Sequence, residues 1–93
     1  MMKTVLVTGA NRGLGLATVR RLAASDTTVL VGARDIHSGE RAAAAIRADG
    51  NDAVAVELDV LSTESLARAA AAIDRRYGRL DLLVNNAGIL PEA

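Results

Sequence analysis

Cysteine, phenylalanine and tryptophan are absent from this 93-residue chain, and each absence narrows what it can do. Without cysteine there is no disulfide, no thiolate nucleophile and no cysteine-ligated zinc or iron–sulfur site. With a single histidine, a metal site would need clustered carboxylates, and the sequence contains no such cluster. We therefore expect no metal site. Because one tyrosine is the only aromatic residue, the core has to be built from Ala, Val, Leu and Ile.

An excess of charge of one sign is also lacking, since 11 acidic residues balance 11 basic ones and no block of like charge occurs. This excludes the basic surface expected of a protein that binds nucleic acid or an anionic membrane. No apolar run approaches the ~20 residues that cross a bilayer. The N-terminal residues lack the apolar segment of a signal peptide. We expect a cytoplasmic protein with no nucleic-acid or membrane partner.

Four short apolar segments alternate with helical patterns along the chain. The predicted strands are residues 4–8, 27–33, 53–60 and 80–86, and the helical patterns are 13–24, 38–50 and 62–78. The second strand is apolar throughout, which is typical of a strand buried on both faces. The β-α-β-α-β-α-β order predicts an α/β fold, a doubly wound parallel sheet in the order 3-2-1-4 that is incomplete at its last strand.

The helix ends carry their own signals. Ser38 is expected to cap the second helix, and Ser62 or Thr63 the third, because a side-chain oxygen can accept hydrogen bonds from the first free N–H groups. Gly50 and Gly78 occupy positions where helices end in a left-handed residue. The third helix also carries an apolar stripe made of Leu66, Ala70, Ile73 and Tyr77.

The last predicted strand, residues 80–86, contains the apolar stretch "LLV", typical of a central strand, although it lies at an open edge of the sheet. An exposed hydrophobic edge invites pairing with another strand. We expect either further polypeptide beside this strand or self-association through it.

The stretch "TGANRGLG", residues 8–15, directly follows the first strand. In a βαβ unit this is where a pyrophosphate can approach the free N–H groups of a helix. Gly9 would form the tight turn, Gly13 would let the phosphates approach, and Gly15 would let helix and strand pack closely. The spacing T-G-x-x-x-G-x-G is neither that of a P-loop nor G-x-G-x-x-G. Alone, it indicates either a dinucleotide site or a purely structural turn.

Two further motifs accompany this spacing: "LDV" at 58–60 and "NNAG" at 85–88. Together the three motifs resemble the short-chain dehydrogenase/reductase family over essentially the whole chain. "GARD" and "SGERA" look most similar to its NADPH-dependent carbonyl reductases. The resemblance implies a Rossmann-type fold, with residues 1–93 as the N-terminal part of a single NAD(P)-binding domain. It also implies hydride transfer between a nicotinamide cofactor and a carbonyl or alcohol substrate.

The resemblance further implies a cofactor contact for each residue that matches a family motif. Asp59 and Val60 would flank the adenine, with Asp59 accepting a hydrogen bond from its exocyclic amine. The backbone of Asn86, Ala87 and Gly88 would contact ribose. The residues implied along the pyrophosphate and the adenosine ribose are Gly9, Asn11, Arg12, Gly13, Leu14 and Gly15.

The choice between NAD and NADP depends on the residues after the second strand. An NAD site usually has an acid about 20 residues beyond the glycine turn, to hold the ribose 2′-hydroxyl. Here Ala33 lies in that region and Arg34 follows it. Since guanidinium binds phosphate with paired donors, Arg34 and Arg12 favour NADP(H) over NAD(H). Two alternatives stay open: both arginines are ordinary solvated residues, or a shift in register lets Asp35 hold the hydroxyl.

The family's catalytic Tyr-x-x-x-Lys pair has no match in the chain. The only tyrosine, Tyr77, is followed four residues later by Asp81, and the only lysine is Lys3. The resemblance implies a catalytic Tyr, Lys, Ser and Asn beyond Ala93. We therefore assign no catalytic residue and expect the chain to be inactive alone, with substrate binding only to a longer form. The alternatives are a stand-alone nucleotide-binding module or a non-functional fragment.

Overall fold

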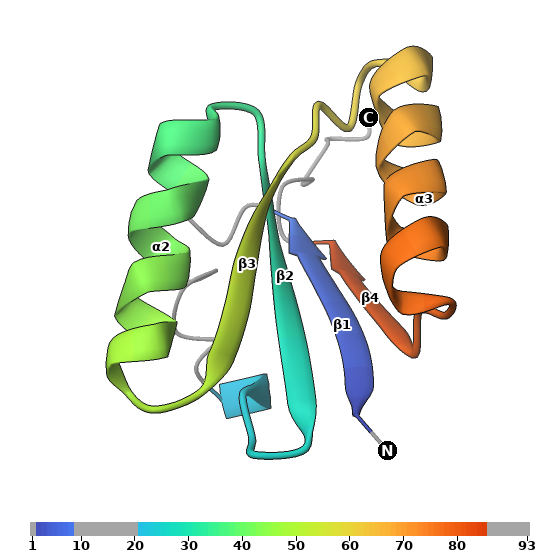
Figure 1. Ribbon diagram of the computed structural model, residues 1–93. Coiled ribbons are helices and arrows are strands. Elements are labelled where there is room, and N and C mark those ends of the chain that lie inside the picture. Colours follow the sequence, from blue (N-terminus) through green and yellow to red (C-terminus); the bar gives the residue numbers. More distant parts are fainter. Residues whose placement is uncertain (1, 9–20, 86–93) are drawn as a thin grey trace.

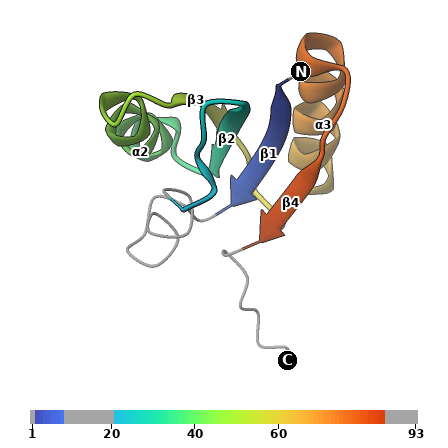
Figure 2. The same cartoon turned by 90° about the horizontal axis from the view of Figure 1, so that it is seen from below.

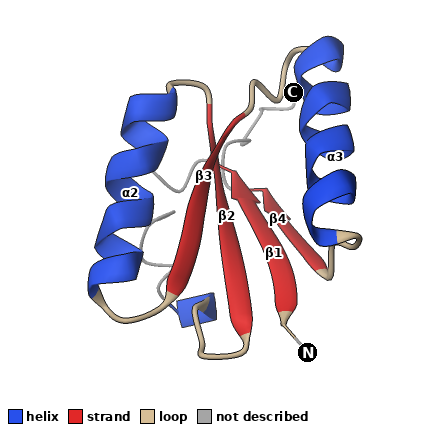
Figure 3. Ribbon diagram, viewed as in Figure 1, coloured by secondary structure: helices blue, strands red, loops and turns tan. Residues whose placement is uncertain are grey.

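Four parallel strands form a sheet in the order β3-β2-β1-β4, as the sequence predicts (Figures 1 and 3). The computed structural model describes residues 2–8 and 21–85. Within them lie β1 (Lys3–Thr8), β2 (Thr27–Ala33), α2 (Ile36–Ala48), β3 (Asp52–Glu57), α3 (Thr63–Tyr77) and β4 (Leu82–Asn85). Most of the first predicted helix, 13–24, lies outside the described residues.

The two helices cover opposite faces of this sheet, which Figure 2 shows nearly end-on. Side chains alternate between the faces of a strand. Val5 and Val7 of β1 therefore belong to a core on the α2 side, whereas Leu6 belongs to a core on the α3 side. β2 is buried along its whole length because both cores include its residues. This arrangement explains the uninterrupted apolar sequence of that strand.

The core on the α2 side is closely packed. Ala43 and Ile46 of α2 are fully buried against the valines of β1 and β2. Leu22 and Ala23, from the end of the first predicted helix, are partly buried and pack against the same core. At Gly39 of α2, an added Cβ would lie 3.1 Å from the Cβ of Ala33. The glycine therefore lets helix and strand approach closely.

The start of α2 differs from the prediction. Asp35, not Ser38, is the N-cap, and it accepts a hydrogen bond from the backbone N–H of His37 at 3.0 Å. An aspartate caps a helix as well as a serine does. Ser38 instead lies in the first turn, where its hydroxyl donates to Asp35 at 3.3 Å. The prediction that Ser38 caps this helix is therefore wrong.

The other predictions for the ends of α2 and α3 are confirmed. Ser62 caps α3 and accepts from the N–H of Ser65 at 3.1 Å. Gly50 and Gly78 have φ angles of 89° and 76°, in the left-handed region that glycine adopts without a Cβ clash. Both helices therefore end where the sequence places a glycine.

Two strands are shorter than predicted, and near the end of each a side chain accepts a hydrogen bond from the backbone. β3 ends at Glu57, whose partner Ala33 is the last residue of β2, rather than at residue 60, and beyond it the N–H of Asp59 donates to the hydroxyl of Ser65 at 2.8 Å. β4 begins at Leu82 rather than at residue 80, after Asp81 has already been fixed to β1. There the Asp81 carboxylate accepts from the N–H of Thr4, and the Asp81 N–H donates to the Thr4 carbonyl, both at 2.8 Å.

Candidate functional site

The carboxyl ends of all four strands meet at one edge of the sheet because the strands are parallel. Thr8 at the end of β1 pairs with Gly32 of β2 on one side and with Asn85 of β4 on the other. The chain order reverses between β1 and β4, since β2 and β3 lie on one side of β1 and β4 on the other. Ligands of open α/β sheets bind in the crevice at such a switch point.

The predicted phosphate and ribose segments border this switch point in sequence. Residues 9–15 directly follow Thr8, and residues 86–88 directly follow Asn85. The register places Thr8 and Asn85, the residues that precede the two segments, beside each other. The following predicted site residues themselves lie outside the described residues: Gly9, Asn11, Arg12, Gly13, Leu14, Gly15, Asn86, Ala87 and Gly88.

The end of β2 presents an arginine at the same edge. Ala33 is buried and pairs with Glu57 of β3, while Arg34 is exposed in the connection to α2. Within residues 2–8 and 21–85, Arg34 forms no ion pair. A solvent-facing guanidinium of this kind can donate to a bound anion.

The adjacent Asp35 is engaged with its own helix. Its carboxylate accepts from the backbone N–H of His37, and this hydrogen bond holds the pKa of Asp35 below its usual value. The Ser38 hydroxyl acts in the same direction. Asp35 is thus charged at neutral pH and oriented toward the first turn of α2.

Asp59 lies beyond β3 in a turn that fixes its side chain. Its carboxylate oxygen Oδ1 accepts from the N–H of Leu61, and its carbonyl accepts from the N–H of Ser62, both at 3.0 Å. Across the part of the chain that the structure describes, no donor reaches the other carboxylate oxygen, Oδ2. An oriented, half-buried carboxylate with one oxygen available suits acceptance from an amine such as that of adenine. Val60, also half-buried, packs against the core on the α3 side.

Sequence reasoning overlooked Ser65, whose buried hydroxyl holds the N–H of Asp59. A serine in the first turn of a helix is ordinary, so composition gives no signal for this role. The same holds for Gly39, whose close approach brings α2 to the end of β2, beside Arg34. A glycine next to an alanine-rich helical segment was the available sign of such close packing.

The only tyrosine and the only lysine lie away from this edge. Lys3 begins β1, and Tyr77 ends α3 shortly before β4 begins. Both are therefore at the amino-terminal edge of the sheet, opposite the predicted cofactor segments.

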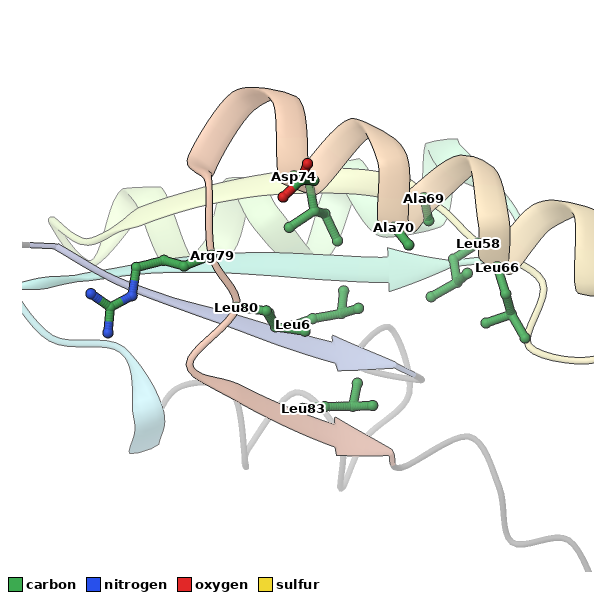
Figure 4. A pocket seen from close by; sticks show the side chains of 10 residues that line it. Leu6, Leu58, Leu66, Ala69, Ala70, Asp74, Arg79, Leu80 and Leu83 are labelled. Carbon is green, nitrogen blue, oxygen red and sulfur yellow. The ribbon is translucent and has the colours of Figure 1, made fainter.

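A separate hollow of about 390 Å³ lies on the α3 side of the sheet (Figure 4). In Figure 4, Leu6 of β1 and Leu83 of β4 lie across from Leu66 of α3. Its walls are almost entirely apolar, and neither Arg34 nor Asp59 borders it. The lining residues are Leu6, Leu58, Leu66, Ala69, Ala70, Ile73, Asp74, Arg79, Leu80 and Leu83.

The described residues contain neither a group of metal-ligating side chains nor a helix suited to span a membrane. No three His, Cys, Asp or Glu residues among residues 2–8 and 21–85 are grouped so that they could hold a metal ion. Over the same residues, no helix combines the length and apolar character that spanning a bilayer requires.

Comparison with known protein families shows to which family this chain belongs. Residues 3–93 match the family model described as short chain dehydrogenase. The chain belongs to this family. A short-chain dehydrogenase/reductase of Aspergillus fumigatus is 44% identical over 91 residues, which make up 95% of this chain and 35% of that protein. The ketoacyl reductase HetN of a Nostoc species is 39% identical over 87 residues, 94% of this chain and 30% of that protein.

Solved short-chain dehydrogenase structures share the fold. A metagenomic short-chain oxidoreductase in complex with NADP has a TM-score of 0.86 and 34% identity, over 94% of this chain and 39% of the other. A variant of the actinorhodin polyketide ketoreductase with NADPH has a TM-score of 0.85 and 38% identity, over 94% and 33%. The chain thus spans about a third of its relatives' length and corresponds to the N-terminal, cofactor-binding part of a short-chain dehydrogenase.

Proposed function

We propose that residues 1–93 are the N-terminal part of one NAD(P)-binding domain whose cofactor is NADP(H). The complete oxidoreductase would transfer hydride between NADP(H) and a carbonyl or alcohol substrate. The bound cofactor would supply or accept that hydride. The observation that carries the preference for NADP(H) is the end of β2. Ala33 occupies the region where an NAD site usually has an acid, and the exposed Arg34 has no ion pair within the described ranges.

The chemistry of this edge favours a phosphate over a hydroxyl. The Arg34 guanidinium could donate two parallel hydrogen bonds to a ribose 2′-phosphate, and Arg12 would add a second positive charge from the glycine turn. Asp35, the acid that follows Arg34 in the sequence, has a carboxylate that already serves the start of α2. Two structures similar to this chain contain NADP or NADPH, which agrees with the proposal.

Each predicted contact has a defined place in this proposal. Asp59 would accept from the adenine amine through Oδ2, and Val60 would flank the ring. The residues after β1, namely Gly9, Asn11, Arg12, Gly13, Leu14 and Gly15, would line the pyrophosphate and adenosine ribose. The residues after β4, namely Asn86, Ala87 and Gly88, would contact ribose through their backbone.

The proposal is tested by reversing the charge pattern after β2. The double substitution Ala33→Asp with Arg34→Ala should shift the ratio of NADH to NADPH affinities toward NADH by about tenfold or more, since a charge-assisted hydrogen bond is lost and an acid gained. Arg68→Ala, which removes an exposed arginine of α3, is the matched control and should leave the ratio unchanged. An unchanged ratio in the double variant would place the 2′-phosphate elsewhere.

The 93-residue chain should bind cofactor without turning over substrate. Tyr77 and Lys3 lie at the amino-terminal edge, so neither can act at the predicted nicotinamide side. We expect no NADPH oxidation in the presence of a panel of ketones and aldehydes. Measurable oxidation would show that the chain contains a catalytic group not assigned to it.

We also propose that the chain self-associates through β4. Leu82 and Leu83 are 44% and 57% exposed, and within the described residues only β1 pairs with β4. Sedimentation velocity should show association that grows with concentration. Leu83→Lys should weaken it, because a charged side chain disfavours edge pairing. A monomer at all concentrations would contradict this proposal.

A further inference from the structure

The turn after β3 holds Asp59 at three of its atoms. The Asp59 N–H donates to the Ser65 hydroxyl at 2.8 Å, its carbonyl accepts from the N–H of Ser62, and its Oδ1 accepts from the N–H of Leu61. Two of these bonds are local and form within the turn itself. Only the bond to Ser65 reaches a residue within α3, beyond its N-cap Ser62. The direction in which Asp59 presents Oδ2 therefore depends on Ser65.

Ser65 is itself firmly placed. It is 7% exposed in the first turn of α3, and its own N–H donates to the hydroxyl of the N-cap Ser62. A buried hydroxyl that is fixed through its backbone has few alternative positions. Ser65 is therefore a rigid acceptor rather than a mobile surface group.

The bond to Ser65 follows directly on the last contact of β3 with its neighbouring strand. The N–H of Leu58 still donates to the carbonyl of Ala33 in β2 at 2.9 Å, as in a continued ladder. The next N–H, that of Asp59, points to the other side of the strand, away from β2, and donates to Ser65. Without that acceptor the Asp59 N–H would have to find another partner, because a backbone donor is rarely left unpaired. The peptide, and the carboxylate attached to it, would then reorient.

We propose that Ser65 is a positioning residue for adenine recognition, acting through Asp59. This inference rests on the proposed cofactor binding, in which Asp59 accepts from the exocyclic amine of adenine. Ser65 has no contact with the ring in this account. It sets the orientation of the carboxylate that reads the amine, and so distinguishes adenine from a base with an oxygen at that position.

The direct test compares NADPH with its hypoxanthine counterpart, in which a carbonyl replaces the exocyclic amine. The unmodified chain should bind NADPH about tenfold more tightly than the analogue, since a hydrogen bond to a carboxylate is lost with the amine. Ser65→Ala should reduce this preference to about threefold or less. Ser65→Thr, which keeps the hydroxyl, should restore it.

Two controls separate positioning from general stability. Gly78→Ala destabilises the far end of α3 through its φ of 76° and should leave the preference intact, since a ratio of affinities does not depend on the folded fraction. Asp59→Ala should abolish the preference, and adding Ser65→Ala to it should change nothing further. A preference that survives Ser65→Ala would overturn the inference.

Amide hydrogen exchange without cofactor gives an independent readout. The Asp59 N–H should be protected in the unmodified chain and should lose that protection in Ser65→Ala, while the N–H of Leu58 keeps its own. Equal exchange of Asp59 in both chains would overturn the inference whatever the cofactor does. If the unmodified chain binds neither dinucleotide, the proposed function fails and adenine recognition with it, and exchange still decides whether Ser65 holds the turn.

Discussion

The two faces of the sheet use the same strands but are covered to different extents. On the α2 side, valines of β1 and β2 meet Ala43 and Ile46, which are completely buried. On the α3 side, Leu66 and Leu83 remain 44% and 57% exposed around the hollow of about 390 Å³. Apolar strand residues line both faces. Leu22 and Ala23 add to the cover of the α2 side, whereas among the described residues no helix besides α3 covers the other.

The difference follows from the order of the strands. Right-handed crossovers place connections that extend the sheet toward β3 on one face and those that extend it past β4 on the other. Within the described residues, α3 is the only helix on its face (Figure 2). One helix is about 10 Å wide and cannot cover four strands. The apolar stripe of α3 is consequently only half used, with Ile73 buried and Leu66 exposed.

The largest expected loss of stability comes from truncating a side chain in the closely packed core on the α2 side. Ile46→Ala should lower the free energy of unfolding by about 2–5 kcal/mol, because it leaves a cavity in a core that cannot collapse. Leu83→Ala, on the open face, should cost about 1 kcal/mol or less. Urea denaturation measures both, and Ile46→Val, at about 1 kcal/mol, keeps the comparison measurable if Ile46→Ala unfolds the chain. Similar losses for Ile46→Ala and Leu83→Ala would show that the faces are equally packed.

The next comparison replaces one glycine on each face by valine, which adds the same side-chain atoms at both positions. At Gly39 the nearest neighbour of a new Cβ is the Cβ of Ala33 at 3.1 Å, which is attached directly to the β2 backbone. Gly39→Val should therefore cost about 1–3 kcal/mol. At Gly32 the nearest atom is the end of the Leu58 side chain at 3.0 Å, which borders the hollow and can move into it. Gly32→Val should cost less, as thermal denaturation of the two variants would show. The reverse order would contradict the account.

Removing the N-cap of α2 and removing that of α3 should lower the stability by similar, smaller amounts, because helix caps act locally. Asp35→Ala at the start of α2 and Ser62→Ala at the start of α3 each remove one acceptor for a free N–H. Each should cost about 1 kcal/mol in urea denaturation. A much larger cost at one of them would mean that the faces differ in their helix ends as well as in their coverage.

The smallest predicted effect concerns the pH dependence at the edge strand. The N–H of Thr4, and next Arg79, lower the pKa of the Asp81 carboxyl. A carboxyl with a lowered folded-state pKa stabilises the fold above its unfolded pKa of about 4, and this contribution is lost as the pH falls through the folded value. The stability advantage over Asp81→Asn should therefore shrink as the pH falls below about 4. Asp35→Asn provides the comparison on the α2 side, where Asn still caps the helix.

A constant difference between the unmodified chain and Asp81→Asn across this pH range would show that Asp81 does not hold β4 through its charge. Melting temperatures recorded in a series of buffers from neutral pH downward suffice for this measurement.

The fold was predictable because its signals are local. The uninterrupted apolar run 27–33 indicated a strand buried on both faces, and Gly50 and Gly78 marked where two helices end. The alternation of strands and helices then left few topologies. The exposed edge at β4 followed from the same pattern, because "LLV" is typical of a central strand and only one neighbouring strand was predicted beside it.

The side-chain hydrogen bonds at the ends of β3 and β4 were not predictable, since they join residues whose proximity arises only in the folded chain. Nothing near Asp59 in the sequence indicates that its N–H bonds to the Ser65 side chain, and Asp81 is 77 residues from Thr4, to which it bonds. Ser38 was predicted to cap α2 because serine is a good capping residue, but Asp35, an equally good one three residues earlier, takes that position. Of the predicted site, Arg34, Asp59 and Val60 lie at the carboxyl edge of the sheet, and their cofactor contacts stay predictions, as do those of the glycine turn and of "NNAG".

The most direct test of the central claim is a calorimetric titration of the purified 93-residue chain with NADPH and then with NADH. The account predicts saturable binding of NADPH that is about tenfold or more tighter than that of NADH, because Arg34 and Arg12 would bind the 2′-phosphate. Equal affinities, or tighter binding of NADH, would contradict the preference for NADP(H). Binding of neither would contradict the proposal that this chain holds the cofactor by itself.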